Sequence, residues 1–108
     1  MKIALSSTAL ALCALVAPSL GHAQAAPAQA LYNRSLAATC ANCHGTDGRA
    51  VQGSSVGSLA GMDKSYLVDQ MKAFKSGARP ATVMHQLSKG YSDAQIEVIA
   101  SYFAAQKK

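Results

Sequence analysis

Three side chains that bind metals or react as thiols stand together in the stretch TCANCHGTDG, residues 39–48. Cys40 and Cys43 are separated by two residues, and His44 follows directly. At this spacing, two thiols can add to the two vinyl groups of one porphyrin, and the adjacent histidine becomes an axial ligand of its iron. The sequence therefore predicts one covalently bound haem of type c.

The cysteine pair has three alternative uses. Two exported thiols commonly form a disulfide, and this is the main alternative to the haem. A thioredoxin-like redox pair follows a strand of a βαβ unit, whereas the residues before Cys40 have the period of a helix and no strand-like alternation is found. A zinc site needs a second pair of ligands at short spacing, and His85 stands alone.

Residues 1–25 have the pattern of a secretory signal peptide. A short positive start precedes the apolar run IALSSTALALCALVAP, and two Ala-x-Ala-like sites follow. We expect cleavage after Ala23 or Ala25, which leaves one domain over residues 26–108 and removes Cys13. An uncleaved anchor is the alternative, although the run is short for a membrane span. Haem attachment of this kind occurs outside the cytoplasm, so the motif and the signal together predict a periplasmic protein.

The charge pattern does not favour a nucleic-acid partner. Ten Lys and Arg against five Asp and Glu give a net charge of +5, but the basic residues are scattered along the chain. A nucleic-acid-binding protein more often concentrates them and adds stacking aromatic residues. We expect a solvated surface, with docking to an acidic protein partner as a secondary possibility. No further segment is apolar enough for membrane insertion.

The rest of the chain is predicted to form helices and loops. A helix over about 28–39 leads into the motif, and a second helix begins near Asp63 and ends at Gly77. The last helix follows a capping box formed by Ser92 and Gln95. The fold is therefore expected to be all-α.

Residues 45–61 are rich in Gly and Ser and predict a long irregular loop. In a small domain such a loop usually surrounds something. A domain of this size is also near the lower limit for a self-sufficient core. We expect the haem to fill that role, and Leu59, Tyr66, Phe74 and Tyr91 to lie in its wall or in the ordinary core.

This order of elements resembles the class I cytochromes c, over essentially the whole chain after the signal peptide. The resemblance implies three to five helices wrapped around one covalent haem, with the first and last helices crossing. It also places the second axial ligand between the helix that ends at Gly77 and the last helix, where GARPATVMHQLSKGYS contains Met84. Met84 is the expected distal ligand; Met62, Met71 and His85 are the alternatives. A His/Met pair favours ferrous iron and leaves no open position for a substrate.

The blocks FKSGARPATVMHQLSKGYSDAQIE and IASYFAAQ are similar to the cytochrome subunit of flavocytochrome c sulfide dehydrogenase. In that family a flavoprotein partner oxidises sulfide and the haem subunit accepts its electrons one at a time. The resemblance implies thioether bonds at Cys40 and Cys43, His44 as the proximal ligand and Met84 as the distal ligand. A single motif indicates the one-haem form, an electron-transfer subunit rather than an enzyme in itself.

One feature departs from the pattern of many class I cytochromes c. They have a proline soon after the motif, whose carbonyl accepts the outer N–H of the histidine, but GTDGRAVQGSSVG contains none. Another backbone carbonyl must therefore orient His44.

Two other functions remain open. The first is a free periplasmic electron shuttle that serves oxidases or reductases. The second is a five-coordinate haem that binds a gas or reduces peroxide, which requires that Met84 does not bind the iron.

Overall fold

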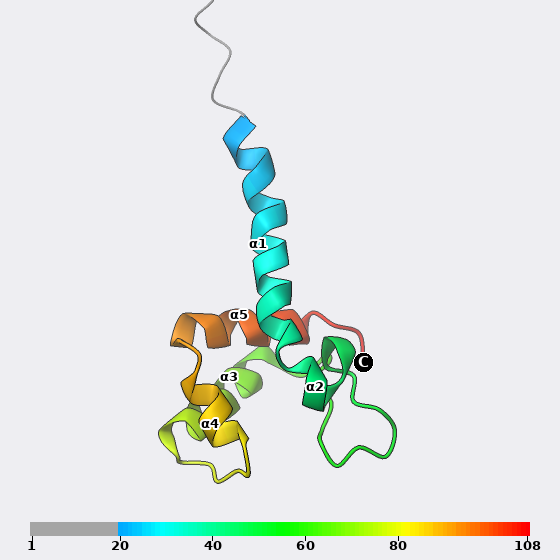
Figure 1. The fold of residues 1–108 in the computed structure, drawn as a ribbon, viewed down its shortest axis with the longest axis vertical. Helices are drawn as coiled ribbons and strands as arrows, with labels where there is room; N and C mark the ends of the chain where they lie inside the picture. The colour runs from blue at the N-terminus through cyan, green and yellow to red at the C-terminus, as the bar shows by residue number, and fades with distance from the viewer. Residues whose placement is uncertain (1–19) are drawn as a thin grey trace, which may run out of the picture.

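The computed structural model describes residues 20–108, with side chains from residue 25 onward. Its elements in chain order are α1 (Leu20–Ala38), α2 (Ala41–His44), the 3-10 turn η1 (Thr46–Gly48), α3 (Lys64–Ser76), α4 (Met84–Lys89) and α5 (Asp93–Ala104) (Figure 1). This part of the chain contains five α-helices and no strand. The predicted all-α class and helix number are confirmed.

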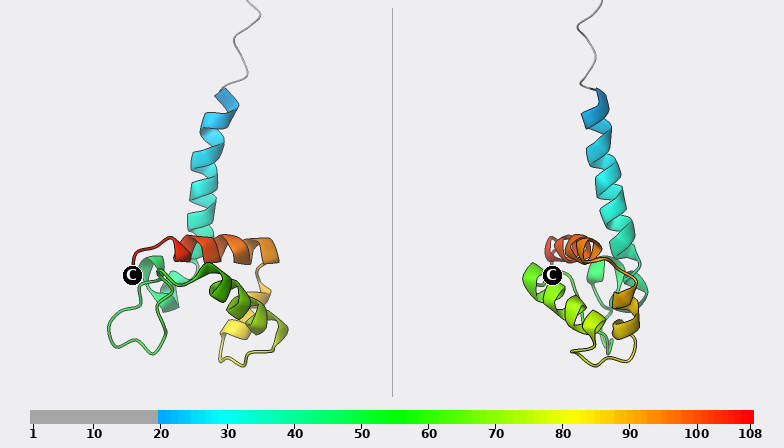
Figure 2. Two further views of the ribbon diagram at one scale, coloured as in Figure 1. Left: turned by 180° about the vertical axis from the view of Figure 1, so that it is seen from behind. Right: turned by 90° about the vertical axis from the view of Figure 1, so that its left-hand side faces the viewer.

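Helix α1 begins at Leu20 rather than near Ala28, and it contains Pro27. The segment is rich in alanine, the residue with the highest helix propensity, which explains the longer helix. Its first turns project away from the other helices (Figures 1 and 2). Most of the expected signal peptide lies outside the described residues, so its cleavage stays a prediction. None of the described helices is long and apolar enough to cross a membrane.

The core forms where the end of α1 meets α5 and where α3 packs beneath α5. Figures 1 and 2 show α5 running across the lower end of α1, which is the expected crossing of the first and last helices. Phe103 and Ile96 of α5 are 1% and 0% exposed, and Ala37 is the buried contribution of α1. The remaining buried apolar residues of this cluster are Leu67, Val68, Ile99 and Ala100.

Side-chain caps define the helices that build this core. The Asp63 carboxylate accepts the Tyr66 N–H at 3.0 Å at the start of α3, and Gly77 ends that helix with a φ of +83°. Ser92 and Gln95 form the predicted capping box of α5, with bonds of 2.9 and 3.2 Å. The predicted bounds of these two helices are confirmed.

Ser92→Ala is expected to lower the free energy of unfolding by about 1 kcal/mol, because the first turn of α5 loses its side-chain cap. Chemical denaturation of the haem-loaded protein measures the change. Ser101→Ala is the matched control, because this hydroxyl lies on the exposed side of α5 and bonds to the Glu97 carbonyl within the helix. An unchanged free energy of unfolding in Ser92→Ala would show that the capping box adds nothing to stability.

Candidate haem-binding site

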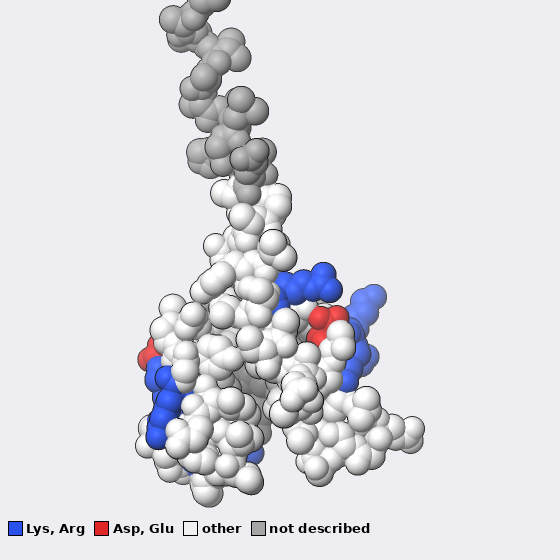
Figure 3. Space-filling view, viewed as in Figure 1, with Lys and Arg blue, Asp and Glu red and all other residues white. Residues whose placement is uncertain are grey.

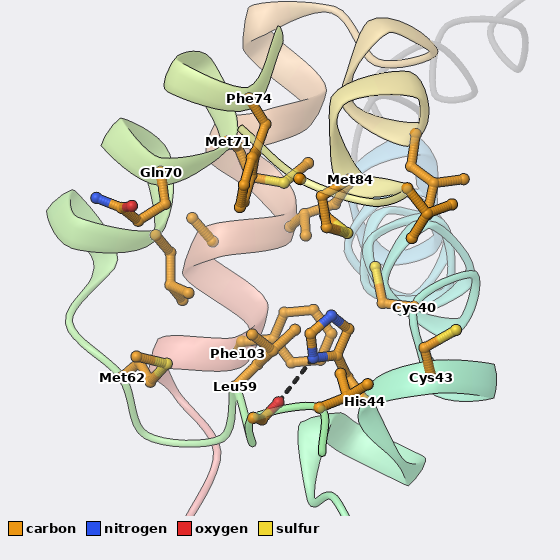
Figure 4. A pocket seen from close by; sticks show the side chains of 18 of the residues that line it. Cys40, Cys43, His44, Leu59, Met62, Gln70, Met71, Phe74, Met84 and Phe103 are labelled. Carbon is orange, nitrogen blue, oxygen red and sulfur yellow. Dashed lines mark hydrogen bonds between the residues drawn. The ribbon is translucent and has the colours of Figure 1, made fainter. Parts of the chain in front are cut away.

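The residues of the Cys-x-x-Cys-His motif border a cavity of about 550 Å³. Its walls come from α2 and the following loop on one side and from α3 and α4 on the other, with α5 behind (Figure 4). Figure 3 shows the cavity as a hollow whose surrounding surface is mostly uncharged, with Lys and Arg on its two flanks. Leu59, Tyr66, Phe74 and Tyr91 all line it, as expected for a haem wall.

Both cysteines are free thiols on one side of the cavity. Cys40 stands at the start of α2, and its carbonyl accepts the His44 N–H at 3.0 Å, so one helical turn carries all three motif side chains. Burial raises the pKa of the Cys40 thiol, and the Thr39 hydroxyl beside it acts in the opposite direction. No disulfide joins Cys40 to Cys43 in the structure.

The ring of His44 is held by a backbone carbonyl from the loop. Its Nδ1 lies 2.7 Å from the Gly57 carbonyl oxygen (Figure 4). A carbonyl only accepts, so Nδ1 carries the proton and donates it. In the neutral ring this tautomer leaves the lone pair of Nε2 available to a metal on the cavity side (Figure 4). The Gly57 carbonyl is thus the backbone acceptor that orients His44, which the sequence alone could not identify.

Three methionines line the cavity, and their positions differ. Met84 is the first residue of α4, and its side chain lies across the cavity from His44 (Figure 4). Met71 Sδ lies 3.7 Å from the hydroxyl of Ser88, a fully buried residue of α4, so Met71 takes part in the packing of α3 on α4. Met62 lies at the side of the cavity (Figure 4).

The remaining alternative ligand lies elsewhere. His85 is absent from the described residues that line the cavity. Its Nδ1 is buried, with no hydrogen-bond partner in the described part of the chain. The structure therefore brings together Cys40, Cys43, His44 and Met84 but not His85.

The cavity wall contains a polar network that the sequence did not predict. The hydroxyls of Thr39 and Tyr91 lie 2.6 Å apart and connect the end of α1 to the segment between α4 and α5. Lys75 of α3 donates to the Tyr91 carbonyl at 2.8 Å and to the Asp93 carboxylate at 2.9 Å. Thr39 and Tyr91 are 52 positions apart in a chain without repeats, so no local pattern marks the pair.

Comparison with known proteins identifies the family. The family model described as Cytochrome c matches residues 25–107. The chain belongs to the cytochrome c family. Cytochromes c are electron-transfer haem proteins that bind haem c covalently, and this chain has Cys40 and Cys43 in the corresponding motif.

Individual cytochromes c share about a third or more of their aligned residues with the chain. The cytochrome subunit of sulfide dehydrogenase from Chlorobaculum tepidum is 40% identical over 73 residues, which cover 68% of this chain and 64% of that protein. The thiosulfate dehydrogenase electron acceptor of Thiomonas intermedia is 37% identical over 83 residues, which cover 77% of this chain and 38% of that protein. Cytochrome c-554(548) of Halomonas halodenitrificans is 36% identical over 72 residues, 64% of this chain and 86% of that protein. The chain thus spans less than two thirds of the first two of these relatives.

The residues present fit a covalently bound haem. Two unpaired thiols stand one helical turn apart, and the adjacent imidazole has its tautomer set by a carbonyl. The cavity is large, and its lining is dominated by apolar side chains. A methionine sulfur, a soft ligand for haem iron, lies across from the imidazole (Figure 4).

The stability of the holoprotein is expected to fall in acid through Asp93. The hydrogen bond and the positive charge of Lys75 lower the pKa of this carboxyl below its ordinary value of 3.8. A lowered folded-state pKa stabilises the fold above the unfolded-state value, and the contribution is lost as the pH falls through the folded-state value. Urea midpoints measured from about pH 5 to about pH 2 should therefore decline less steeply in Asp93→Asn than in the unmodified chain.

Asp69→Asn is the control for this measurement, because Asp69 makes no ion pair among the described residues. A decline that is equally steep in Asp93→Asn and in the unmodified chain would contradict the role of the Lys75–Asp93 pair.

Proposed function

We propose that this cytochrome c is a periplasmic one-electron carrier whose haem is bound through Cys40, Cys43, His44 and Met84. The observation that carries the ligand assignment is the pair of side chains that face each other across the cavity. The Gly57 carbonyl holds His44 with Nε2 available, and Met84 lies opposite (Figure 4). Export with removal of residues 1–23 or 1–25 belongs to the same proposal.

The chain's own residues restrict what the bound group can do. Haem c supplies a single iron that exchanges one electron between its ferrous and ferric states. His44 and Met84 would both bind the iron, and this would leave no coordination position open to a substrate, a gas or peroxide. The apolar wall excludes water and disfavours the extra charge of the ferric state. These effects support electron transfer and weigh against the five-coordinate alternative.

We further propose that the electrons come from a sulfide-oxidising flavoprotein. Support comes from the 40% identity with the cytochrome subunit of sulfide dehydrogenase. Docking to an acidic protein is supported by the mouth of the cavity, which is mostly uncharged, and by Lys and Arg on its flanks, although Asp and Glu lie beside some of them (Figure 3). The likeness to a thiosulfate dehydrogenase electron acceptor favours a second candidate, a shuttle that receives electrons from thiosulfate oxidation.

Met84→Leu tests the distal ligand with little change in side-chain volume. The variant is expected to keep its covalent haem, to lose the weak red band of methionine-ligated ferric haem, and to bind carbon monoxide. Its reduction potential should fall by on the order of 0.1 V, within the span of about 0.8 V that axial ligands control. Absorption spectroscopy and redox titration give these values.

Met62→Leu and Met71→Leu are matched controls, because both side chains line the same cavity. They are expected to retain the red band and to exclude carbon monoxide. If one of them loses the band while Met84→Leu keeps it, the distal ligand has been assigned to the wrong methionine.

The donor is tested on protein purified gently from its native periplasm. Addition of sulfide is expected to bleach a co-purifying flavin and to reduce the haem, at a rate that falls as the salt concentration rises. Thiosulfate is the matched control and should leave both spectra unchanged. Haem reduction by thiosulfate, with no flavin present, would exclude the sulfide proposal and support the second candidate.

A further inference from the structure

The Gly57 carbonyl orients His44, and its own position requires an explanation. The Gly57 carbonyl is not held in place by packing around Gly57, because a Cβ added to this residue would meet nothing within 4 Å. Proline does not restrict the backbone either, since residues 45–61 contain none. The residues before Gly57 bond only within the loop: Ser54 N–H to the Val51 carbonyl, and Val56 N–H to the Ser54 hydroxyl.

The three residues after Gly57 are all bonded to the other end of the loop. Ser58 Oγ accepts the Ala50 N–H at 3.0 Å. The N–H groups of Leu59 and Ala60 donate to the Gly48 carbonyl at 2.7 and 3.1 Å. Gly48 is itself buried, and a Cβ there would lie 2.7 Å from Phe103 of α5. The two ends of loop 49–58 are thus attached to the core. Among the residues that make this attachment, Ser58 is the one next to Gly57 in the sequence.

Peptide planarity transmits this attachment to the carbonyl. The Gly57 carbonyl and the Ser58 N–H and Cα lie in one peptide plane. The hydrogen bond that fixes Ser58 therefore also limits the direction of the Gly57 carbonyl oxygen. Gly57 itself adds little restraint, because a glycine backbone is flexible. On the Ser58 side of this peptide plane, the nearest hydrogen bond is the one that the Ser58 hydroxyl accepts from the Ala50 N–H.

We propose that Ser58 is a positioning residue for the proximal ligand. Its hydroxyl holds the Gly57–Ser58 peptide so that the carbonyl accepts the Nδ1–H of His44. This inference rests on the proposed function, in which His44 binds the iron. A hydrogen-bonded imidazole is the more basic ligand. It stabilises ferric over ferrous iron, so the Ser58 hydroxyl keeps the reduction potential lower than it would otherwise be.

The test uses the haem-loaded protein and the variant Ser58→Ala. Its midpoint potential is expected to shift upward, and the Nδ1 proton of His44, followed by NMR in the ferrous state, should exchange with solvent faster. Ser58 is exposed, so the fold and the low-spin spectrum should persist. A purely structural role in closing the loop would lower thermal stability without moving the potential or the exchange rate.

Two further variants make the result specific. Ser58→Thr keeps the hydroxyl and should restore both values. Ser54→Ala removes a hydroxyl that accepts a backbone N–H at 3.1 Å in the same loop, and it should leave both values unchanged. An unshifted potential in Ser58→Ala, an equal shift in Ser54→Ala, or no recovery in Ser58→Thr would each overturn the inference.

The outcome separates this inference from the proposed function. If the unmodified protein has the low-spin spectrum of two protein ligands and Ser58→Ala behaves identically, only the role of Ser58 is wrong. If the unmodified protein lacks that spectrum, the ligand assignment itself has failed.

Discussion

The fold depends on filling one apolar cavity. When the cavity of about 550 Å³ is not filled, the apolar side chains that line it stay in contact with water and contribute little to stability. An ordinary small domain is stable by only about 5–15 kcal/mol, so this lost burial matters. The buried apolar side chains belong mainly to α3 and α5, with Ala37 from α1. The bound cofactor is therefore part of the core as well as the redox centre, and the surrounding helices need not form a closed core among themselves.

The two walls of the cavity are attached to a common support, α5. On the His44 side, Tyr102 donates to the Asp47 carboxylate, and the Gly61 N–H donates to the Phe103 carbonyl at 2.9 Å. On the opposite side, α3 packs on α5 through Leu67 and Val68, and α4 packs on α3. Both walls of the cavity thus pack on α5, which limits how far apart they can move when the cavity is filled.

Sequence patterns predicted the parts of this arrangement that have a local cause. The cysteine spacing, the Asp63 and Ser92 caps and the Gly77 terminus each depend on a few neighbouring residues, and the structure contains them where expected. The start of α1 was predicted near Ala28 rather than at Leu20 because the residues up to Ala25 were assigned to the signal peptide, whereas the alanines of this segment sustain the helix. Gly57 and the Thr39–Tyr91 pair were not predictable, because their contacts span 13 and 52 positions through an irregular loop and a tertiary crossing.

Rigid walls explain why this architecture suits electron transfer. A one-electron carrier is fast when its ligands move little between redox states, and here the two proposed ligands are restrained by contacts that do not involve the metal. The His44 ring is held through Gly57, and the α4 backbone at Met84 is held by the buried Ser88 hydroxyl, which donates to the Met84 carbonyl at 2.6 Å. Neither restraint depends on a bond to the metal. In the proposed site, both would hold the two side chains in the same place in the ferrous and the ferric state, which is what a one-electron carrier requires.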